Sequence, residues 1–232
     1  MDEQYQIAPL GDSGLTIYLA DDISETAHQQ VRALWLHLEK CAFPGVIEYV
    51  PAYVSLTIYY DPRKISLSRL RTLINEQLPK VSPNTSVKQR RHIQIPVCYE
   101  SEFAPDINII TAQLKLNREE IIKLHTSKTY LVYMLGFIPG FAYLGTLPEA
   151  LVMSRHAIPR LNVPAGSVGI AGFQTAIYPV DSPGGWQLIG RTPLALLSQD
   201  RDLPTLLQPG DEVSFQAICK QQFLDLEKKE AC

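Results

Sequence analysis

Hydrophobic and polar positions alternate along the first ninety residues in a way that predicts strands and helices in turn. Runs rich in β-branched and aromatic residues predict strands over 5–10, 14–19, 46–50 and 54–60. Apolar residues at helical spacing predict helices over 24–40 and 66–78. Asp22 and Glu25 stand at capping-box separation, which predicts the start of the first helix. The order ββαββα predicts an α+β domain over residues 1–88, with both helices on one face of the sheet.

The rest of the chain has a different pattern, beginning after a polar segment, 79–89, that we interpret as a linker. A strand is expected over 91–97, and Asn117 with Glu120 predicts a capped helix that ends near residues 125–126. Residues 136–190 contain nine of the thirteen glycines and four charged residues, in short β-like runs. This pattern predicts a mainly-β domain over 89–232 that forms a small closed barrel. A helix over 193–199, a strand over 211–218 and a solvated, mobile tail at 227–230 complete the prediction.

Composition and charge exclude several classes of function. The net charge of −3 is spread evenly along the chain, which argues against a nucleic-acid partner. An acidic N-terminus and the absence of a long apolar run argue against a signal peptide and a membrane span, so we expect a cytoplasmic location. The four cysteines are widely spaced, and we expect no metal site. Without a Walker-type phosphate loop, this chain alone is not expected to bind ATP in that manner.

Histidines and arginines supply the first candidates for chemistry. His125 ends a predicted helix, where the macrodipole favours a protonated imidazole that either carries protons or caps carbonyls. Arg155, His156 and Arg160 form either an anion site for a carboxylate or phosphate, or a solvated loop. The remaining histidines are expected at the surface: His28, His37 and His92.

A second group of candidates lies between residues 172 and 193. Arg191 is a charge in apolar company and needs a partner, either an internal carboxylate such as Asp181 or an anionic ligand. Gln174 and Tyr178 are uncharged hydrogen-bonding groups that suit an amide or lactam. These residues predict a barrel with a polar, arginine-bearing pocket, and they do not by themselves name a reaction.

Several segments together resemble one family, the B subunits of the bacterial ATP-dependent 5-oxoprolinase. The family includes the sporulation-kinase inhibitor KipI and is also labelled allophanate hydrolase subunit 1. The resemblance spans nearly the whole chain and rests on residues 9–12, 124–126, 136–144, 163–172, 174–175, 177–179, 182–186 and 189–193. Ala176 stands where the family usually has glycine, and Phe173 occupies a variable position.

The resemblance implies a cyclophilin-like barrel after the N-terminal α/β domain. It also implies two partners within the 5-oxoprolinase, a carboxyltransferase-like C subunit and a LamB/YcsF-type A subunit. Such complexes use ATP to cleave 5-oxoproline (pyroglutamate) to glutamate, so this chain is expected to be inactive alone.

Within this family setting, we assign roles by residue type and motif position. His125 is the candidate proton carrier and Arg191 the carboxylate or phosphate clamp. Candidate substrate-binding residues are Gln174, Tyr178, Arg160 and Thr192.

Two alternatives remain open from the sequence. As a KipI-type inhibitor, the chain would dock on a sensor histidine kinase through an apolar surface near Phe137, Phe141 and Trp186. Alternatively, it belongs to a complex that processes urea or allophanate.

Overall fold

The computed structural model describes residues 5–81 and 90–230 and divides the chain into two compact units, 1–89 and 90–232. Of the linker predicted over 79–89, residues 79 and 80 belong to a 3-10 turn, Leu78–Lys80, and residues 82–89 lie outside the described ranges. Each unit has its own hydrophobic core.

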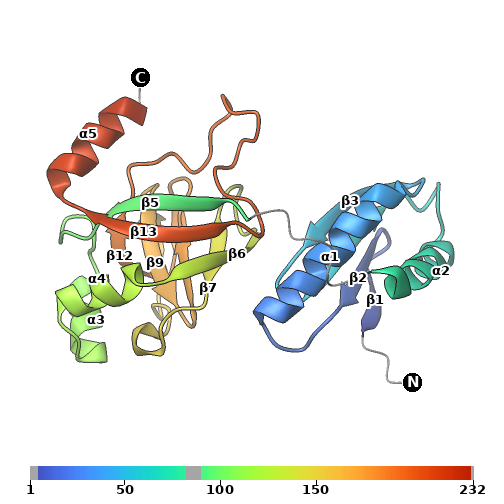
Figure 1. Ribbon diagram of the computed structural model, residues 1–232, viewed down its shortest axis with the longest axis horizontal. Coiled ribbons are helices and arrows are strands. Elements are labelled where there is room, and N and C mark those ends of the chain that lie inside the picture. The colour runs from blue at the N-terminus through green and yellow to red at the C-terminus, as the bar shows by residue number, and fades with distance from the viewer. Residues whose placement is uncertain (1–4, 82–89, 231–232) are drawn as a thin grey trace. The chain divides into compact units, whose positions relative to one another are not determined.

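The first unit is a four-stranded antiparallel sheet with strand order β1-β2-β4-β3 and two helices (Figure 1). Its elements are β1 Gln6–Leu10, β2 Gly14–Tyr18, α1 Glu25–Cys41, β3 Val46–Pro51, β4 Ser55–Tyr60 and α2 Leu67–Gln77. Alternating residues such as Leu15 and Ile17 of β2 form one buried cluster with Leu34 of α1 and Leu70 of α2. Both helices therefore pack on the same face of the sheet.

Two details of α1 differ from the sequence prediction. The N-cap is Ser24, whose hydroxyl accepts a hydrogen bond from the Ala27 amide, so the cap assigned to Asp22 is wrong. His28 is buried on the core-facing side of the helix at 3% exposure, so its expected surface position is also wrong.

The second unit contains a closed barrel of seven strands in the order β10-β7-β6-β13-β5-β12-β9, and β9 pairs with β10 to close it. Strands β5 and β13 run parallel over seven residue pairs, and the other neighbours are antiparallel. A separate pair, β8 and β11, lies outside the barrel. The strands are β5 His92–Cys98, β6 Thr129–Leu135, β7 Ala142–Gly145, β8 Arg160–Val163, β9 Ser167–Ala171, β10 Gln174–Ile177, β11 Ser182–Gly184, β12 Gln187–Arg191 and β13 Glu212–Ile218.

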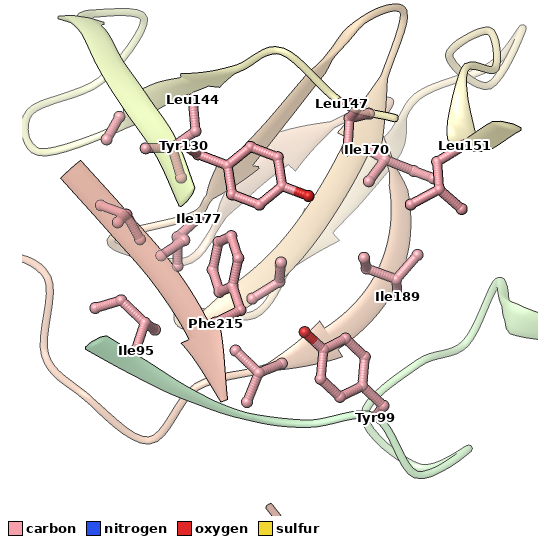
Figure 2. Close-up of a cluster of buried hydrophobic side chains, with 14 of the residues drawn as sticks. Ile95, Tyr99, Tyr130, Leu144, Leu147, Leu151, Ile170, Ile177, Ile189 and Phe215 are labelled. Carbon is pink, nitrogen blue, oxygen red and sulfur yellow. The ribbon is translucent and has the colours of Figure 1, made fainter. Parts of the chain in front are cut away.

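Side chains from different strands fill the barrel. Figure 2 shows Tyr130, Phe215 and Ile177 converging on the interior with the aliphatic side chains of neighbouring strands. The interior is thus a packed core, as expected for a barrel of this size, and any binding site must lie at its ends or on its outer loops.

Three helices accompany the barrel: α3 Ile107–Leu114, α4 Arg118–Thr126 and α5 Lys220–Glu230 (Figure 1). The capping box predicted for α4 is present, because the side chains of Asn117 and Glu120 each accept a hydrogen bond from the other's amide.

One prediction near the C-terminus is wrong, and another is confirmed in part. Residues 193–199 form no helix; they pair instead with 204–206 through Leu196, Leu197 and Ser198. Residues 227–230 are exposed but belong to α5, which buried Phe223 anchors against Phe103 at 4.4 Å between ring centroids.

Candidate functional site

An aromatic cluster lies among the segments that connect β7, β10 and β12. Phe141 meets Tyr143, Tyr178 and Trp186 edge-on, with ring centroids 4.9, 5.1 and 5.8 Å apart. Gly184 makes the approach of Tyr178 possible, because a Cβ there would lie 2.3 Å from the phenolic oxygen. The cluster places the hydroxyl of Tyr178, a predicted substrate-binding group, beside β11.

Arg155 lies on this cluster. Its guanidinium carbon is 5.5 Å from the centroid of the Trp186 ring, a cation–π arrangement. Burial raises the pKa of Tyr178, and the charges of Arg155 and Arg160 oppose that rise. Both arginines therefore lie within electrostatic reach of the Tyr178 hydroxyl.

Arg160 and His156 face inward, toward a carboxylate that the sequence did not single out. Asp106 is completely buried and accepts hydrogen bonds from Arg160 Nη2 and, at 2.7 Å, from the Leu188 amide. His156 Nε2 lies 3.2 Å from Asp106 Oδ2, without the angles of a hydrogen bond. The sequence left two interpretations of the 155–160 segment, an anion site or a solvated loop. Arg160 fits neither of them fully, because Asp106 neutralises its charge inside the protein.

Buried polar atoms around this ion pair remain without partners. Within the described ranges, Arg160 Nη1 and Gln187 Oε1 are buried and have no hydrogen-bond partner, although Gln187 Nε2 donates to the Ser154 carbonyl. Such groups are uncommon in native structures and usually have a partner, which ordered water or a ligand can supply.

Arg191 lies at the other end of β12. Its Nε donates to the Ala165 carbonyl at 2.8 Å, and its guanidinium carbon is 6.0 Å from the Phe223 ring centroid. Asp181 accepts from the Ala165 amide at 2.8 Å rather than from Arg191, so it is not the internal partner that the sequence suggested. Among the described residues, no carboxylate lies within ion-pair distance of Arg191.

Thr192 and Gln174, two further predicted substrate-binding residues, occupy separate positions. Thr192 is buried, and its hydroxyl accepts a hydrogen bond from the Leu194 amide at 3.3 Å, which shapes the chain after β12. Gln174 begins β10, opposite Gly145 of β7 and Ala171 of β9. The structure therefore does not gather all of the predicted binding residues at one point.

His125 is part of a buried hydrogen-bond network. Tyr99 Oη lies 2.8 Å from Nδ1, Thr175 Oγ1 lies 3.0 Å from Nε2, and the Thr175 hydroxyl also reaches the Gly169 carbonyl. Because Thr175 donates its one proton to that carbonyl, Nε2 must donate to Thr175 and Nδ1 must accept from Tyr99. The ring is neutral and both of its nitrogens are satisfied.

This network contradicts the protonated imidazole predicted from the helix dipole. His125 is completely buried and stacks on Phe215 at 4.4 Å, and burial lowers its pKa to about 3. The cost of desolvating a charged imidazole exceeds the stabilisation by the helix dipole, which for an exposed charge is no more than about 1 kcal/mol.

The three predicted interface residues differ in exposure. Phe137 is 63% exposed and has a positive φ of 70°, which is strained for a bulky side chain. Phe141 and Trp186 are buried in the aromatic cluster, so these two do not form an exposed apolar surface in this structure.

Asp106 is the residue that sequence reasoning missed. It precedes the apolar run of α3, and a carboxylate in that position is typical of an N-cap. In the structure it makes no side-chain cap bond; it bonds residues 54 and 82 positions away instead. Its position before the helix was visible in the sequence, but that position indicated an N-cap and not a partner for Arg160.

The described ranges contain neither a membrane-spanning helix nor a metal-ligand cluster. No helix there combines the length and apolarity needed to cross a lipid bilayer. No group of three His, Cys, Asp or Glu side chains is placed there to hold a metal ion.

Comparison with known proteins defines the class first. Residues 5–207 match the family model of the carboxyltransferase domain, subdomain C and D. A solved structure, TTHA0988, superposes with a TM-score of 0.78 at 38% identity, covering 88% of this chain and 40% of that longer chain.

Curated relatives then define the family. The B subunit of 5-oxoprolinase from Bacillus subtilis is 42% identical, covering 96% of this chain and 97% of its own. The B subunit from Haemophilus influenzae is 43% identical, covering 90% and 96%. The urea amidolyase of Saccharomyces cerevisiae is 31% identical and is covered over 11% of its length. The chain belongs to the family of 5-oxoprolinase B subunits.

Proposed function

We propose that this chain is the B component of an ATP-dependent 5-oxoprolinase complex that hydrolyses 5-oxo-L-proline to L-glutamate. The observation that carries the proposal is the match to 5-oxoprolinase B subunits over almost the full length of both chains, at 42–43% identity. The complex works in the cytoplasm with a carboxyltransferase-like C subunit and a LamB/YcsF-type A subunit, and this chain is inactive without them. Its barrel is of the cyclophilin-like type, which does not carry prolyl isomerase activity with it.

The reaction requires activation of a resonance-stabilised amide. Phosphorylation of the lactam carbonyl followed by attack of water is a route that uses ATP, and the developing negative charge must meet fixed cations and donors. Arg191 suits this role because its Nη groups have no carboxylate partner within the described residues, while its Nε bond to Ala165 fixes its direction. We propose it as the clamp for a carboxylate or phosphate.

The other predicted roles differ in how well the geometry supports them. Tyr178 places its hydroxyl near two arginines, which supports a substrate-orienting donor. Gln174 lies at the start of β10, and we propose the same substrate-orienting role for it. Thr192, Arg160 and His125 bond internally, so we propose that they shape the site rather than contact substrate.

The first experiment is an affinity pull-down of the tagged full chain from its native host, followed by mass spectrometry. Recovery of the A and C subunits, and glutamate formation by the recovered complex from 5-oxo-L-proline and ATP, would support the proposal. Recovery of a histidine kinase without those subunits would instead make the chain an inhibitor.

Urea in place of 5-oxo-L-proline provides the second arm of the assay. The match to urea amidolyase makes urea the alternative substrate to test. ATP hydrolysis that depends on urea and not on 5-oxo-L-proline would contradict the proposed substrate.

A further inference from the structure

Arg155 contacts an aromatic ring, yet its charge has no carboxylate partner among the described residues. The residue is exposed, and its guanidinium carbon lies 5.5 Å from the centroid of the buried Trp186 ring. No carboxylate within the described ranges lies at ion-pair distance from it. A cation fixed on an aromatic face without a counter-charge is prepared for an external anion.

The geometry of the guanidinium group decides which anion fits. A guanidinium is planar and carries its N–H donors in that plane, so contact with an aromatic ring leaves it able to donate. Two parallel donors in that plane match the two oxygens of a carboxylate or a phosphate. A neutral ligand gains nothing comparable from this arrangement.

Asp106 is the internal carboxylate near this segment, and it is already engaged. It bonds Arg160 and the Leu188 amide, and it is completely buried. One buried negative charge therefore offsets Arg160, and the charge of Arg155 remains uncompensated. His156 lies against the same carboxylate, so Arg160 and His156 both anchor the 155–160 segment at Asp106.

Two phenols lie near the same charge. The Tyr143 ring centroid lies 6.0 Å from that of Trp186, and the Tyr178 hydroxyl lies against Gly184, two residues before Trp186. Burial raises the pKa of both tyrosines, and the charge of Arg155 opposes the rise at both.

We propose that Arg155, in cation–π contact with Trp186 and near Tyr143 and Tyr178, is an oxyanion-binding subsite for a small organic acid. Resting on the proposed function, the ligand is the carboxylate of 5-oxo-L-proline. The subsite is separate from Arg191, because Trp186 precedes β12 and Arg191 ends it, about 16 Å along the strand. One small molecule does not span both arginines, so the second holds a different anionic group.

The test is an NMR titration of the full-length chain, because its two tryptophans give two indole N–H signals. A Trp35→Phe variant assigns the signal of Trp186. The probes are 5-oxo-L-proline, inorganic phosphate, and 2-pyrrolidone, the neutral lactam without a carboxylate. Each is added to the wild type, Arg155→Gln, Arg155→Lys and the control Arg71→Gln, an exposed arginine of α2.

We expect 5-oxo-L-proline to shift the Trp186 signal and 2-pyrrolidone to leave it unchanged. Arg155→Gln should weaken binding at least about tenfold, since a charge-assisted bidentate contact is lost. Arg155→Lys should weaken it less, and Arg71→Gln should match the wild type. Stronger binding of phosphate than of 5-oxo-L-proline would keep the oxyanion subsite and reassign its ligand to a phosphoryl group. Equal binding by Arg155→Gln and the wild type, or no response to either anion, would overturn the subsite.

Activity of the assembled complex separates a failure of the Arg155 subsite from a failure of the proposed function. If the assembled complex hydrolyses 5-oxo-L-proline equally well with Arg155→Gln, the function stands and the substrate subsite is wrong. If the anion binds through Arg155 but the complex has no 5-oxoprolinase activity, the subsite stands and the function is wrong.

Discussion

Removing the Asp106 carboxylate tests most directly whether its ion pair with Arg160 fixes the 155–160 segment. Asp106→Ala deletes the acceptor of Arg160 Nη2 and of the Leu188 amide, and it leaves both donors beside an apolar methyl group. Breaking a buried ion pair costs about 3–5 kcal/mol. Because the Arg160 side chain is 31% exposed and regains some hydration, we expect about 3 kcal/mol.

The assay uses one tryptophan as the reporter of the second unit. Trp35 lies in the first unit and Trp186 in the second, so a Trp35→Phe background makes urea unfolding of the second unit visible alone. In thermal unfolding the same loss corresponds to about 10 °C for a unit of this size. Asp106→Asn keeps an oxygen for the Leu188 amide and should cost about half as much.

A double-mutant cycle with Arg160→Gln separates the ion pair from general packing. The two single changes should be clearly non-additive, with a coupling energy of about 1–2 kcal/mol. A loss below about 1 kcal/mol for Asp106→Ala, or additive effects in the cycle, would refute the argument that this pair fixes the segment.

Three further predictions concern other parts of the second unit. Unfolded His125 binds a proton below about pH 6.5 and the folded form does not, so stability should fall by about 2 kcal/mol from pH 7 to pH 5. Urea midpoints at both pH values check this, and an equal fall in His125→Gln would contradict it. Arg191→Ala should keep its partners in the pull-down but reduce activity of the complex at least about tenfold; full activity would exclude the clamp. Asn117→Ala should cost about 1 kcal/mol in urea unfolding and Asn117→Asp much less, because aspartate still caps α4; equal losses would argue against the cap.

Elements whose stability comes from nearby residues are predictable from the sequence. The capping box at Asn117 and the alternating apolar residues of β2 and β4 depend on positions within a few residues of one another. The helix expected over 193–199 shows the opposite case. Its leucines have helical spacing, but backbone bonds from Ser198 to Pro204 and from Leu206 to Leu196 satisfy the chain across a turn, and this pairing displaces the helix.

The candidate site is less predictable because its partners are distant in sequence. The sequence marks Arg160 as part of an anion site, but its carboxylate partner, Asp106, lies 54 positions earlier and looks like an ordinary N-cap. The sequence also marks His125 as a candidate for chemistry, but its burial against Phe215 depends on a strand 90 positions away and reverses the expected protonation. In both cases residue type identifies the position, and tertiary contacts decide the role.

Because residues 136–190 contain few charged side chains, few cations there are available to bind an anionic ligand. Of the four charged residues there, Glu149 is exposed and two are used internally, since Arg160 bonds Asp106 and Asp181 bonds the Ala165 amide. Arg155 remains on Trp186, and Arg191 follows at the far end of β12 on Phe223. Both are cations held on aromatic rings without a carboxylate partner in the described ranges. Under the proposed function, the complex binds a carboxylate substrate and a phosphoryl donor, and parallel variants of these two arginines would show which group each one holds.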